Sequence, residues 1–247
     1  MSESALLTIG IPVSSQGEAA PLDRTLNAIH QVLPGSDIEV LVQVNEAAPS
    51  EWAMGIGEHA VQPKVECQTD HGIYDAMNRL MERATGARIL FLGAGDAPLT
   101  GLQRALDRWE TVEDVLELGG VRIPNAEPRV PRHYPARWDR TLRWRNVTHH
   151  QGIAYPLTLL RTFGGFRTEY KVLADYALNI DMWQEGVKAR WTAGEDWVSA
   201  APGGVSRQFN TALYDEERRM KVALLKPGMA KALLPLWMGI KSRWKRG

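Results

Sequence analysis

The sequence has 247 residues with 29 basic and 29 acidic side chains, so its formal net charge is zero. That balance provides no bulk attraction to nucleic acid, and we expect no nucleic-acid partner. Its 44% apolar and 23% charged residues are typical of a packed globule and exclude a disordered chain. Cys67 is the single cysteine, which excludes an internal disulfide and suits a reducing compartment.

The two ends of the chain bear on where the protein works. The first residues lack the basic-then-apolar layout of a signal peptide, and no run approaches the roughly 20 apolar residues of a spanning helix. We therefore expect a cytoplasmic protein. From Arg218 to the end, every charged side chain is basic. A segment of one sign favours a partner of the opposite charge, and an anionic membrane surface is the simplest such partner.

Strand-like and helix-like segments alternate in the first half of the chain. Apolar runs predict strands at residues 5–11, 38–44, 64–68 and 88–92. Apolar residues at helical spacing predict helices at residues 21–33 and 73–84, with Pro21 at a first helical position and Gly86 after the second helix. This alternation indicates βαβ units, an α/β fold and a mostly parallel sheet.

The second half is less regular. We predict helices at residues 99–109, 156–163, 174–185 and 206–225. Strands are expected at residues 115–123, 187–192 and 197–200, and a long loop rich in Pro, Arg and Trp at residues 124–146. No repeat interrupts this order, so one domain over residues 1–225 followed by a basic tail over residues 226–247 is the simplest organisation.

The segment from Thr69 to Asp96 combines a loop, a helix and a buried strand that ends in a Gly-rich turn. Asp70 follows the third predicted strand, and Asp96 follows the fourth. Ligands of open α/β sheets bind at the carboxyl ends of the strands. We therefore expect both acids along one edge of the sheet.

Polar residues near the start of that helix indicate a phosphate ligand. Asp75 and Asn78 are three residues apart and share a helix face. Free N–H groups at a helix N-terminus favour phosphate, and Gly93 and Gly95 allow a ligand close to the backbone. A carboxylate beside a diphosphate requires a divalent cation between them, and Mg²⁺ or Mn²⁺ suits such oxygen ligands.

Structural roles explain the same residues equally well on spacing alone. Asp70 would cap the helix, and Asp75 would pair with Arg79 one turn further on. Asp96 would start a turn before Pro98. Spacing leaves both interpretations open.

The whole segment resembles the family 2 glycosyltransferase pattern Asp-x-Gly-Ile-Tyr-Asp-Ala-Met-Asn, then Ala-x-Gly, then an apolar strand ending Phe-Leu-x-x-x-Asp. It is most similar to the branch that builds bacterial exopolysaccharides and O-antigens. Three further segments match in the family's order: His150-Gln151, the Leu-Ala-Asp-Tyr of residues 173–176 and the Gly-Gly-Val-Ser of residues 203–206. Together the matches span more than half of the chain.

The resemblance implies a GT-A fold, which is Rossmann-like with a mostly parallel mixed sheet flanked by helices. It also implies an inverting transferase that uses a nucleotide-diphosphate sugar as donor. Asp70 would lie near the base or ribose, and Asp96 would hold Mn²⁺ or Mg²⁺ on the diphosphate. With them, Asp75, Asn78 and Gly95 are the expected donor-binding residues.

Two positions depart from the family pattern. Family members carry an Asp-rich loop after the second strand, whereas this chain has Val44-Asn45-Glu46-Ala47, so Asn45 or Glu46 would have to contact the base. Ala94 replaces the first acid of the Asp-x-Asp motif. A cation held by Asp96 would then keep several waters and two phosphate oxygens, and its affinity would be modest.

Inversion requires a carboxylate that takes the proton of the attacking acceptor hydroxyl, while the cation offsets charge on the leaving diphosphate. Within the Ala-Asp-Tyr match, Asp175 is the predicted base, and an ordinary acid at a helix N-terminus is the alternative. His150 is the second candidate, as base or acceptor contact. His149 and His150 are adjacent, so we expect no zinc site.

The loop and the tail suggest the acceptor and the location. Trp138 and Trp144 would border the acceptor, and the loop arginines would suit a saccharide acceptor carrying phosphate, such as a polyprenyl-diphosphate-linked sugar. These arginines are Arg132, Arg137, Arg140, Arg143 and Arg145. The tail mixes apolar and basic residues as an interfacial helix does, predicting a peripheral protein on the inner face of the cell membrane. A helix docked on the protein's own core or on a second subunit is the alternative.

Two other functions stay open. The missing acids allow a catalytically silent protein that binds a nucleotide sugar or scaffolds a polysaccharide assembly complex. The second is a nucleotidyltransferase, which should have a basic Gly-rich loop after the first strand. Because Ser14-Ser15-Gln16-Gly17 has no Lys or Arg, this function ranks last.

Overall fold

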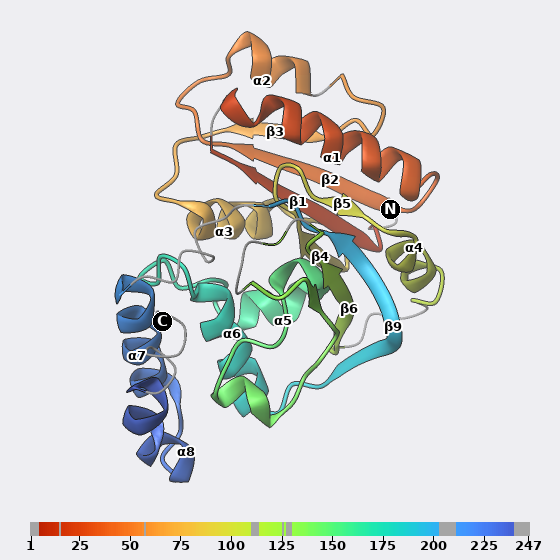
Figure 1. Cartoon of the computed structure of the whole chain (residues 1–247). Coiled ribbons are helices and arrows are strands. Elements are labelled where there is room, and N and C mark those ends of the chain that lie inside the picture. The colour runs from red at the N-terminus through yellow and green to blue at the C-terminus, as the bar shows by residue number, and fades with distance from the viewer. Residues whose placement is uncertain are drawn as a thin grey trace.

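The structure is a computed structural model that describes residues 5–14, 16–56, 58–109, 114–124, 126, 130–202 and 211–239. A single mixed sheet crosses the molecule, with helices on both sides (Figure 1). Its strand order is β3-β2-β1-β4-β8-β6-β9-β5, with β7 paired to β6. The α/β class and the helix-flanked, mostly parallel sheet expected from the sequence are confirmed.

The first half of the chain forms the parallel side of the sheet. The strands are β1 (Leu7–Val13), β2 (Ile38–Val44), β3 (Lys64–Cys67) and β4 (Arg88–Phe91). β1 pairs in parallel with β2 and β4, and β2 pairs in parallel with β3. The carboxyl ends of all four strands therefore meet at one edge of the sheet.

The helices between these strands follow the apolar periodicity. They are η1 (Gln16–Glu18), α1 (Ala19–Val32), α2 (Glu51–Ile56) and α3 (Ile73–Arg83). Along α3, Ala76, Met77, Leu80 and Met81 are buried as predicted, whereas Ile73, the first residue of the predicted stripe, is exposed. The short α2 was not predicted, because its six residues include just two buried side chains.

The second half extends the sheet with strands of both directions. Its elements are β5 (Ala97–Pro98), α4 (Thr100–Leu106), β6 (Leu116–Arg122), β7 (His133–Tyr134), η2 (Arg140–Arg143), η3 (His150–Gly152), β8 (Ile153–Pro156), α5 (Leu157–Thr162), α6 (Ala174–Gln184) and β9 (Ala189–Ser199). β8 lies antiparallel between β4 and β6, so β4 and β6 run in the same direction. The C-terminal end of β6 thus reaches the same edge as that of β4.

One expectation for this half was wrong, and the short strands β7 and β8 were missed. Residues 187–192 and 197–200 are not two strands but parts of the single bent strand β9 (Figure 1). The register against β6 jumps from Trp191 to Asp196, and Gly194 in the extra loop has a φ of +74°, so the polar interruption is a bulge. β8 was missed because its four residues end at Pro156, which the sequence suggested as a helix start.

The two faces of the sheet bury separate cores, since successive residues of a strand point to opposite sides. In β4, Ile89 and Phe91 pack with α3, α5 and α6, whereas Leu90 packs with α1, α2 and α4. Figure 1 shows α1 and α2 on one side of the strands and α3 and α6 on the other. Each face is therefore a helix-covered apolar layer, and the polar residues of interest collect at the strand ends.

The C-terminal helices α7 (Thr211–Leu224) and α8 (Met229–Ala232) follow, and residues 234–239 are also helical. Leu234 and Met238 are buried in the same apolar core as residues of α6 and α7. The Trp237 indole N–H donates to the Trp144 carbonyl at 3.2 Å. For these residues the structure bears out the alternative of packing on the core, whereas Leu233 and Leu236 remain exposed. The division of the chain at residue 225 remains a prediction.

Candidate active site

Three of the predicted residues follow parallel strands at the same sheet edge. Asn45 follows β2, Asp70 follows β3, and Asp96 follows β4 by way of a Gly-rich turn. The expectation that Asp70 and Asp96 lie along one edge is confirmed by this pairing. The edge is the usual ligand-binding side of an open α/β sheet.

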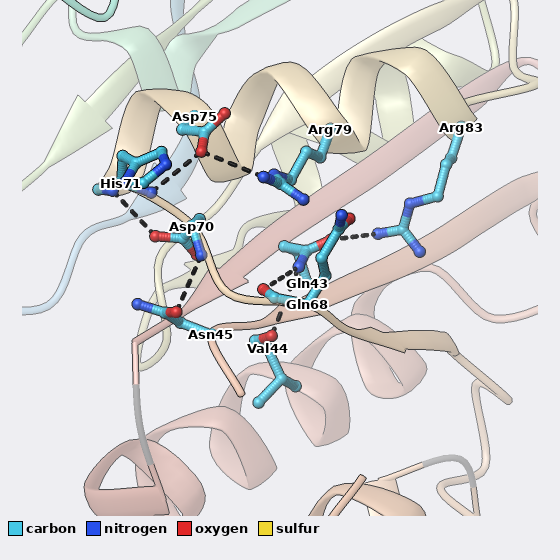
Figure 2. Close-up of polar contacts among 10 residues, drawn as sticks. Gln43, Val44, Asn45, Gln68, Asp70, His71, Asp75, Arg79 and Arg83 are labelled. Carbon is cyan, nitrogen blue, oxygen red and sulfur yellow. Dashed lines mark hydrogen bonds and ion pairs between the residues drawn. The ribbon is translucent and has the colours of Figure 1, made fainter. Parts of the chain in front are cut away.

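The loop between β3 and α3 is fixed by side chains that bond to its backbone (Figure 2). The Asn45 side-chain oxygen accepts from the Asp70 N–H at 3.0 Å, and the Asp70 carboxylate accepts from the Gly72 N–H at 2.9 Å. The Asp75 carboxylate accepts from the His71 N–H at 3.0 Å. Three residues predicted to bind the donor thus shape a turn in which Gly72 has a φ of +123°.

Asp75 also forms the ion pair with Arg79 that spacing allowed, at 3.4 Å (Figure 2). The His71 N–H and the Arg79 guanidinium lower the pKa of Asp75 below 3.8, although partial burial opposes them. The carboxylate is therefore ionised at neutral pH and needs a cationic or N–H partner. This structural pairing does not test the donor role of Asp75, which stays a prediction.

Asn78 uses its whole side-chain amide on the loop after α5. Its Nδ2 donates to the Phe166 carbonyl, and its Oδ1 accepts from the Phe166 N–H, each at 2.8 Å. The preceding Gly165 has a φ of +70°, and a Cβ there would lie 2.5 Å from Asn78 Oδ1. Asn78 thus has a structural role, and we leave it out of the donor site proposed below.

Asp96 is buried, and its carboxylate accepts hydrogen bonds from three parts of the chain. Oδ2 accepts from the Gly93 N–H at 2.6 Å and from the Gln151 side-chain amide, while Oδ1 accepts from the Ala201 N–H at 2.8 Å. Gly95 has a φ of +99°, which favours glycine, and its N–H donates to a threonine hydroxyl on α1 at 2.8 Å. Asp96 therefore anchors the turn, and the sequence did not predict Gln151 or Ala201 beside it.

Both candidate catalytic residues come together at the N-terminal end of α6. The Asp175 carboxylate accepts from the Tyr74 hydroxyl at 3.0 Å, and its other oxygen lies 3.4 Å from His150 Nδ1. Burial would raise the pKa of Asp175, but His150, the Tyr176 N–H and Tyr74 outweigh it and lower the pKa below 3.8. Asp175 is thus an ionised carboxylate within the protein, with a histidine at its side.

His150 and Gln151 connect the two carboxylates. They are consecutive residues of η3, the turn that leads into β8 at the sheet edge. His150 contacts Asp175, and Gln151 contacts Asp96. The His149 ring stacks on His150 with centroids 5.0 Å apart, and Tyr134 packs edge-on to His149. One dipeptide therefore places the predicted metal ligand and the predicted base around the same turn.

A divalent cation at Asp96 was implied by the resemblance, and the donor set fits one. Asp96 offers a buried carboxylate, and Gln151 Oε1 beside it is buried without a hydrogen-bond partner in the described part of the chain. Oxygen ligands of this kind suit Mg²⁺ or Mn²⁺. Among the described residues, no group of three or more His, Cys, Asp or Glu side chains could hold a metal ion. Diphosphate oxygens and waters would have to complete the coordination.

A hollow of about 410 Å³ lies near the C-terminal ends of β6 and β9 and is lined by Arg122, Pro124, Arg132, His133 and Asp196. Asp196 Oδ2 accepts from Arg122 Nε at 2.5 Å, and Asp196 Oδ1 lies 2.7 Å from His133 Nε2. The described lining contains two arginines and one carboxylate, so it keeps a positive balance. Of the other loop arginines, Arg137 pairs with an aspartate and Arg143 lies over Trp183.

Trp138 and Trp144, which were predicted to border the acceptor, both contact other parts of the protein, and this packing does not test the predicted acceptor contact. The Trp138 indole N–H donates to the Val187 carbonyl at 2.9 Å, and the Trp144 ring packs on Trp237. Both rings are therefore used within the protein. The Gly-Gly-Val-Ser segment of residues 203–206 falls outside the described residues. Within residues that are described, the structure has no helix long and apolar enough to cross a membrane.

Comparison with known proteins gives similar sequences and a common fold. The chain is 35% identical over 155 residues to PGL/p-HBAD biosynthesis glycosyltransferases of Mycobacterium bovis and Mycobacterium tuberculosis. The match covers 59% of this chain and 54% of each relative, so it spans about half the length of those proteins. No protein-family model matches the chain.

Solved structures match almost the whole chain. Staphylococcus aureus TarS 1–349 in complex with UDP-GlcNAc matches with a TM-score of 0.66 at 13% identity, covering 97% of this chain and 72% of that one. The mannosyltransferase PcManGT from Pyrobaculum calidifontis, in complex with GDP-Man and Mn²⁺, matches with a TM-score of 0.62 at 19% identity, covering 98% and 72%. The fold is therefore that of glycosyltransferase structures, as the resemblance implied.

Proposed function

We propose that the chain is an inverting, metal-dependent glycosyltransferase that moves a sugar from a nucleotide-diphosphate sugar to a saccharide acceptor. We assign it to family 2 and to polysaccharide biosynthesis of the exopolysaccharide and O-antigen kind. The observation that carries the proposal is the pair of buried carboxylates, Asp96 and Asp175, joined through Gln151 and His150 at the ligand-binding edge of the sheet. The similarity to glycosyltransferases in sequence and fold supports it.

The donor would lie across the ends of β1 to β4. In this proposal Asn45 and Asp70 border the base and ribose, and Gly95 lets the diphosphate approach the backbone. Asp96, with Gln151 nearby, would hold Mn²⁺ or Mg²⁺ on the diphosphate. When bound, the cation would offset the charge that develops on the leaving group. Binding of UDP-GlcNAc and GDP-Man by the structural neighbours supports a donor of this class.

The transfer is a displacement at the anomeric carbon. The acceptor hydroxyl oxygen forms the new bond as the bond to the diphosphate oxygen breaks, and the hydroxyl proton passes to a base. We assign this proton to Asp175, because its carboxylate is ionised. An ionised carboxylate has about four acceptor sites, and Tyr74, His150 and the Tyr176 N–H occupy three of them. The remaining site would take the proton. His150 is the second candidate, with Asp175 orienting its ring.

The acceptor would approach from the side of β6 and β9. The hollow that contains Arg122, Arg132 and His133 lies there, and its positive balance suits a phosphate group. A polyprenyl-diphosphate-linked saccharide has this chemistry. Such an acceptor resides in a bilayer, so we also propose peripheral attachment to the inner face of the cell membrane. Exposed Leu233 and Leu236, with Lys226 and Lys231 nearby in sequence, are the described part of that surface.

Thermal unfolding with a panel of nucleotide sugars, each with and without Mn²⁺, tests the proposal. We expect one donor to raise the melting temperature in the presence of Mn²⁺, and Asp96→Asn to remove that increment. In the variant, the Asn amide N–H would face a backbone N–H donor, which lowers the stability of the metal-free protein. The donor-induced increment is therefore measured from the variant's own melting temperature. If no nucleotide sugar stabilises the wild type, the proposed function is wrong.

The alternative is a catalytically silent protein that binds the nucleotide sugar or scaffolds an assembly complex, motivated by Ala94 in place of the first acid. Such a protein would be stabilised by the donor but would release no nucleoside diphosphate under any condition. A turnover assay on the donor that binds therefore separates the two functions.

A further inference from the structure

The side-chain amide of Gln151 is only half satisfied. Gln151 is 8% exposed, and its Nε2 donates to the Asp96 carboxylate. Its Oε1 is fully buried and has no hydrogen-bond partner in the described ranges of the chain. A buried carbonyl without a partner loses the hydrogen bonds that water would give it, and such groups in a folded protein call for an explanation.

The neighbouring carboxylate explains the orientation of this amide. With no cation present, Nε2 must face Asp96, because the reverse orientation would set Oε1 against a carboxylate oxygen. A cation beside Asp96 would reverse that preference. Oε1 would then face the cation, since a carbonyl oxygen is a ligand that Mg²⁺ and Mn²⁺ accept. The rotation would place Nε2 at the buried position that Oε1 now occupies, so the driving force for the rotation is the cation–carbonyl contact.

The sequence around Asp96 leaves room for such a ligand. Ala94 stands where the first acid of an Asp-x-Asp motif would be, so the turn after β4 supplies a single carboxylate. Gln151 reaches Asp96 from η3, which is 55 residues away in the chain. We propose that Gln151, by turning its amide, supplies the second protein oxygen for a divalent cation beside Asp96. This inference rests on the proposed metal use of the same site.

The variant Gln151→Glu separates a cation ligand from a residue that only anchors Asp96. It puts two carboxylates side by side, so the metal-free protein should be less stable under either role. Only a cation site is repaired by metal: Mn²⁺ alone should raise the melting temperature of the variant more than that of the wild type. Its Mn²⁺ affinity, measured by electron paramagnetic resonance of free Mn²⁺, should increase about tenfold or more. Gln151→Met keeps the size and removes both polar atoms, and should weaken Mn²⁺ binding by about 10–100-fold.

Gln103→Glu is the matched control. The Gln103 amide also donates to an aspartate, Asp107, at 2.7 Å, but on the exposed side of α4. The control variant therefore creates the same Glu–Asp pair away from the sheet edge, and its Mn²⁺ affinity should equal that of the wild type. Tightening in the control as in Gln151→Glu would overturn the inference, because any carboxylate pair would then suffice.

The remaining outcomes are equally decisive. If the wild type, Gln151→Glu and Gln151→Met bind Mn²⁺ with equal affinity, the inference is wrong. It is also wrong if neither the wild type nor Gln151→Glu binds Mn²⁺. Calorimetry with nucleotide sugars on the wild type reads the proposed function separately. If no nucleotide sugar binds while Gln151→Glu tightens Mn²⁺, the cation site stands and the proposed function fails.

Discussion

Replacing Asp175 by Asn is the most informative perturbation of the proposed chemistry. The side chain keeps its shape, and its oxygen can still accept from the Tyr74 hydroxyl, so the fold should persist. What is lost is the ionised carboxylate that takes the proton. General-base contributions are about 10²–10⁴-fold in rate, which corresponds to roughly 3–5 kcal/mol in the activation barrier at 1.36 kcal/mol per tenfold.

The effect should be confined to turnover. A base acts in the transition state rather than in donor binding, so kcat should fall by that factor while donor affinity by calorimetry stays unchanged. Release of nucleoside diphosphate in the absence of an acceptor, with water as the nucleophile, is a usable assay. Asp181→Asn is the control: it lies on the same helix and loses its 2.6 Å ion pair with Arg167, yet should keep the wild-type rate.

The pH dependence identifies which member of the pair is the base. His150 and the Tyr74 hydroxyl hold the pKa of Asp175 below 3.8, so an Asp175 base stays ionised and the rate should be flat from about pH 5 to 8. A loss of rate toward acid within that range would instead indicate a base that becomes protonated there. Asp175 is not the base if Asp175→Asn keeps more than about a tenth of the wild-type rate. It is also not the base if the wild-type rate falls toward acid pH and this fall disappears in His150→Gln.

Three further predictions concern packing and ion pairing elsewhere in the fold. Gly165→Ala should destabilise the fold more than Gly164→Ala, since both have a positive φ but only the first brings a Cβ within 2.5 Å of a side-chain oxygen; equal urea midpoints would contradict this. Leu234→Ala should lower the free energy of unfolding by about 2–5 kcal/mol, because Leu234 is buried. Leu236→Ala should leave that free energy unchanged, because Leu236 is exposed, but it should weaken sedimentation with anionic liposomes. A Leu234→Ala variant as stable as the wild type would show that the tail does not pack on the core. Burial raises the pKa of Glu39, but hydrogen bonds from a lysine and two threonines outweigh it and lower the pKa below 4.5. Ionised Glu39 therefore stabilises the folded protein above that pH, and this contribution is lost as the pH falls through the pKa of Glu39 in the folded protein. In Glu39→Gln, the free energy of unfolding should fall less steeply toward acid pH than in the wild type.

The regular part of the fold was readable from periodicity. The apolar stripe from Ile73 to Ala84 predicted α3 within a residue, and the strand–helix alternation predicted the parallel sheet. Elements without a periodic signal were missed or misread. β8 has four residues, and the bulge at Gly194 made β9 resemble two strands. The local sequence pattern does not show that β8 inserts between β4 and β6, or that the register of β9 against β6 jumps.

The candidate site was predicted in its acids but not in their partners. Asp96 and Asp175 stood out because a motif surrounds each. Gln151 belongs to the matched His150-Gln151 pair, but the sequence assigned it no role, because a glutamine carries no charge signal and its contact with Asp96 bridges 55 positions. Tyr74 meets Asp175 across 101 positions, which only tertiary structure reveals. Asn78 shows the reverse: it lies in the motif, yet its amide is committed to the backbone of Phe166.

The stereochemistry of donor cleavage shows directly whether the protein is an inverting transferase. Once the donor is identified, its slow hydrolysis with Mn²⁺ can be followed by proton NMR before the released sugar mutarotates. We predict that the first free sugar has the anomeric configuration opposite to that of the donor, and that Asp175→Asn releases almost none. Release with retained configuration, or no release from a donor that binds, would contradict it.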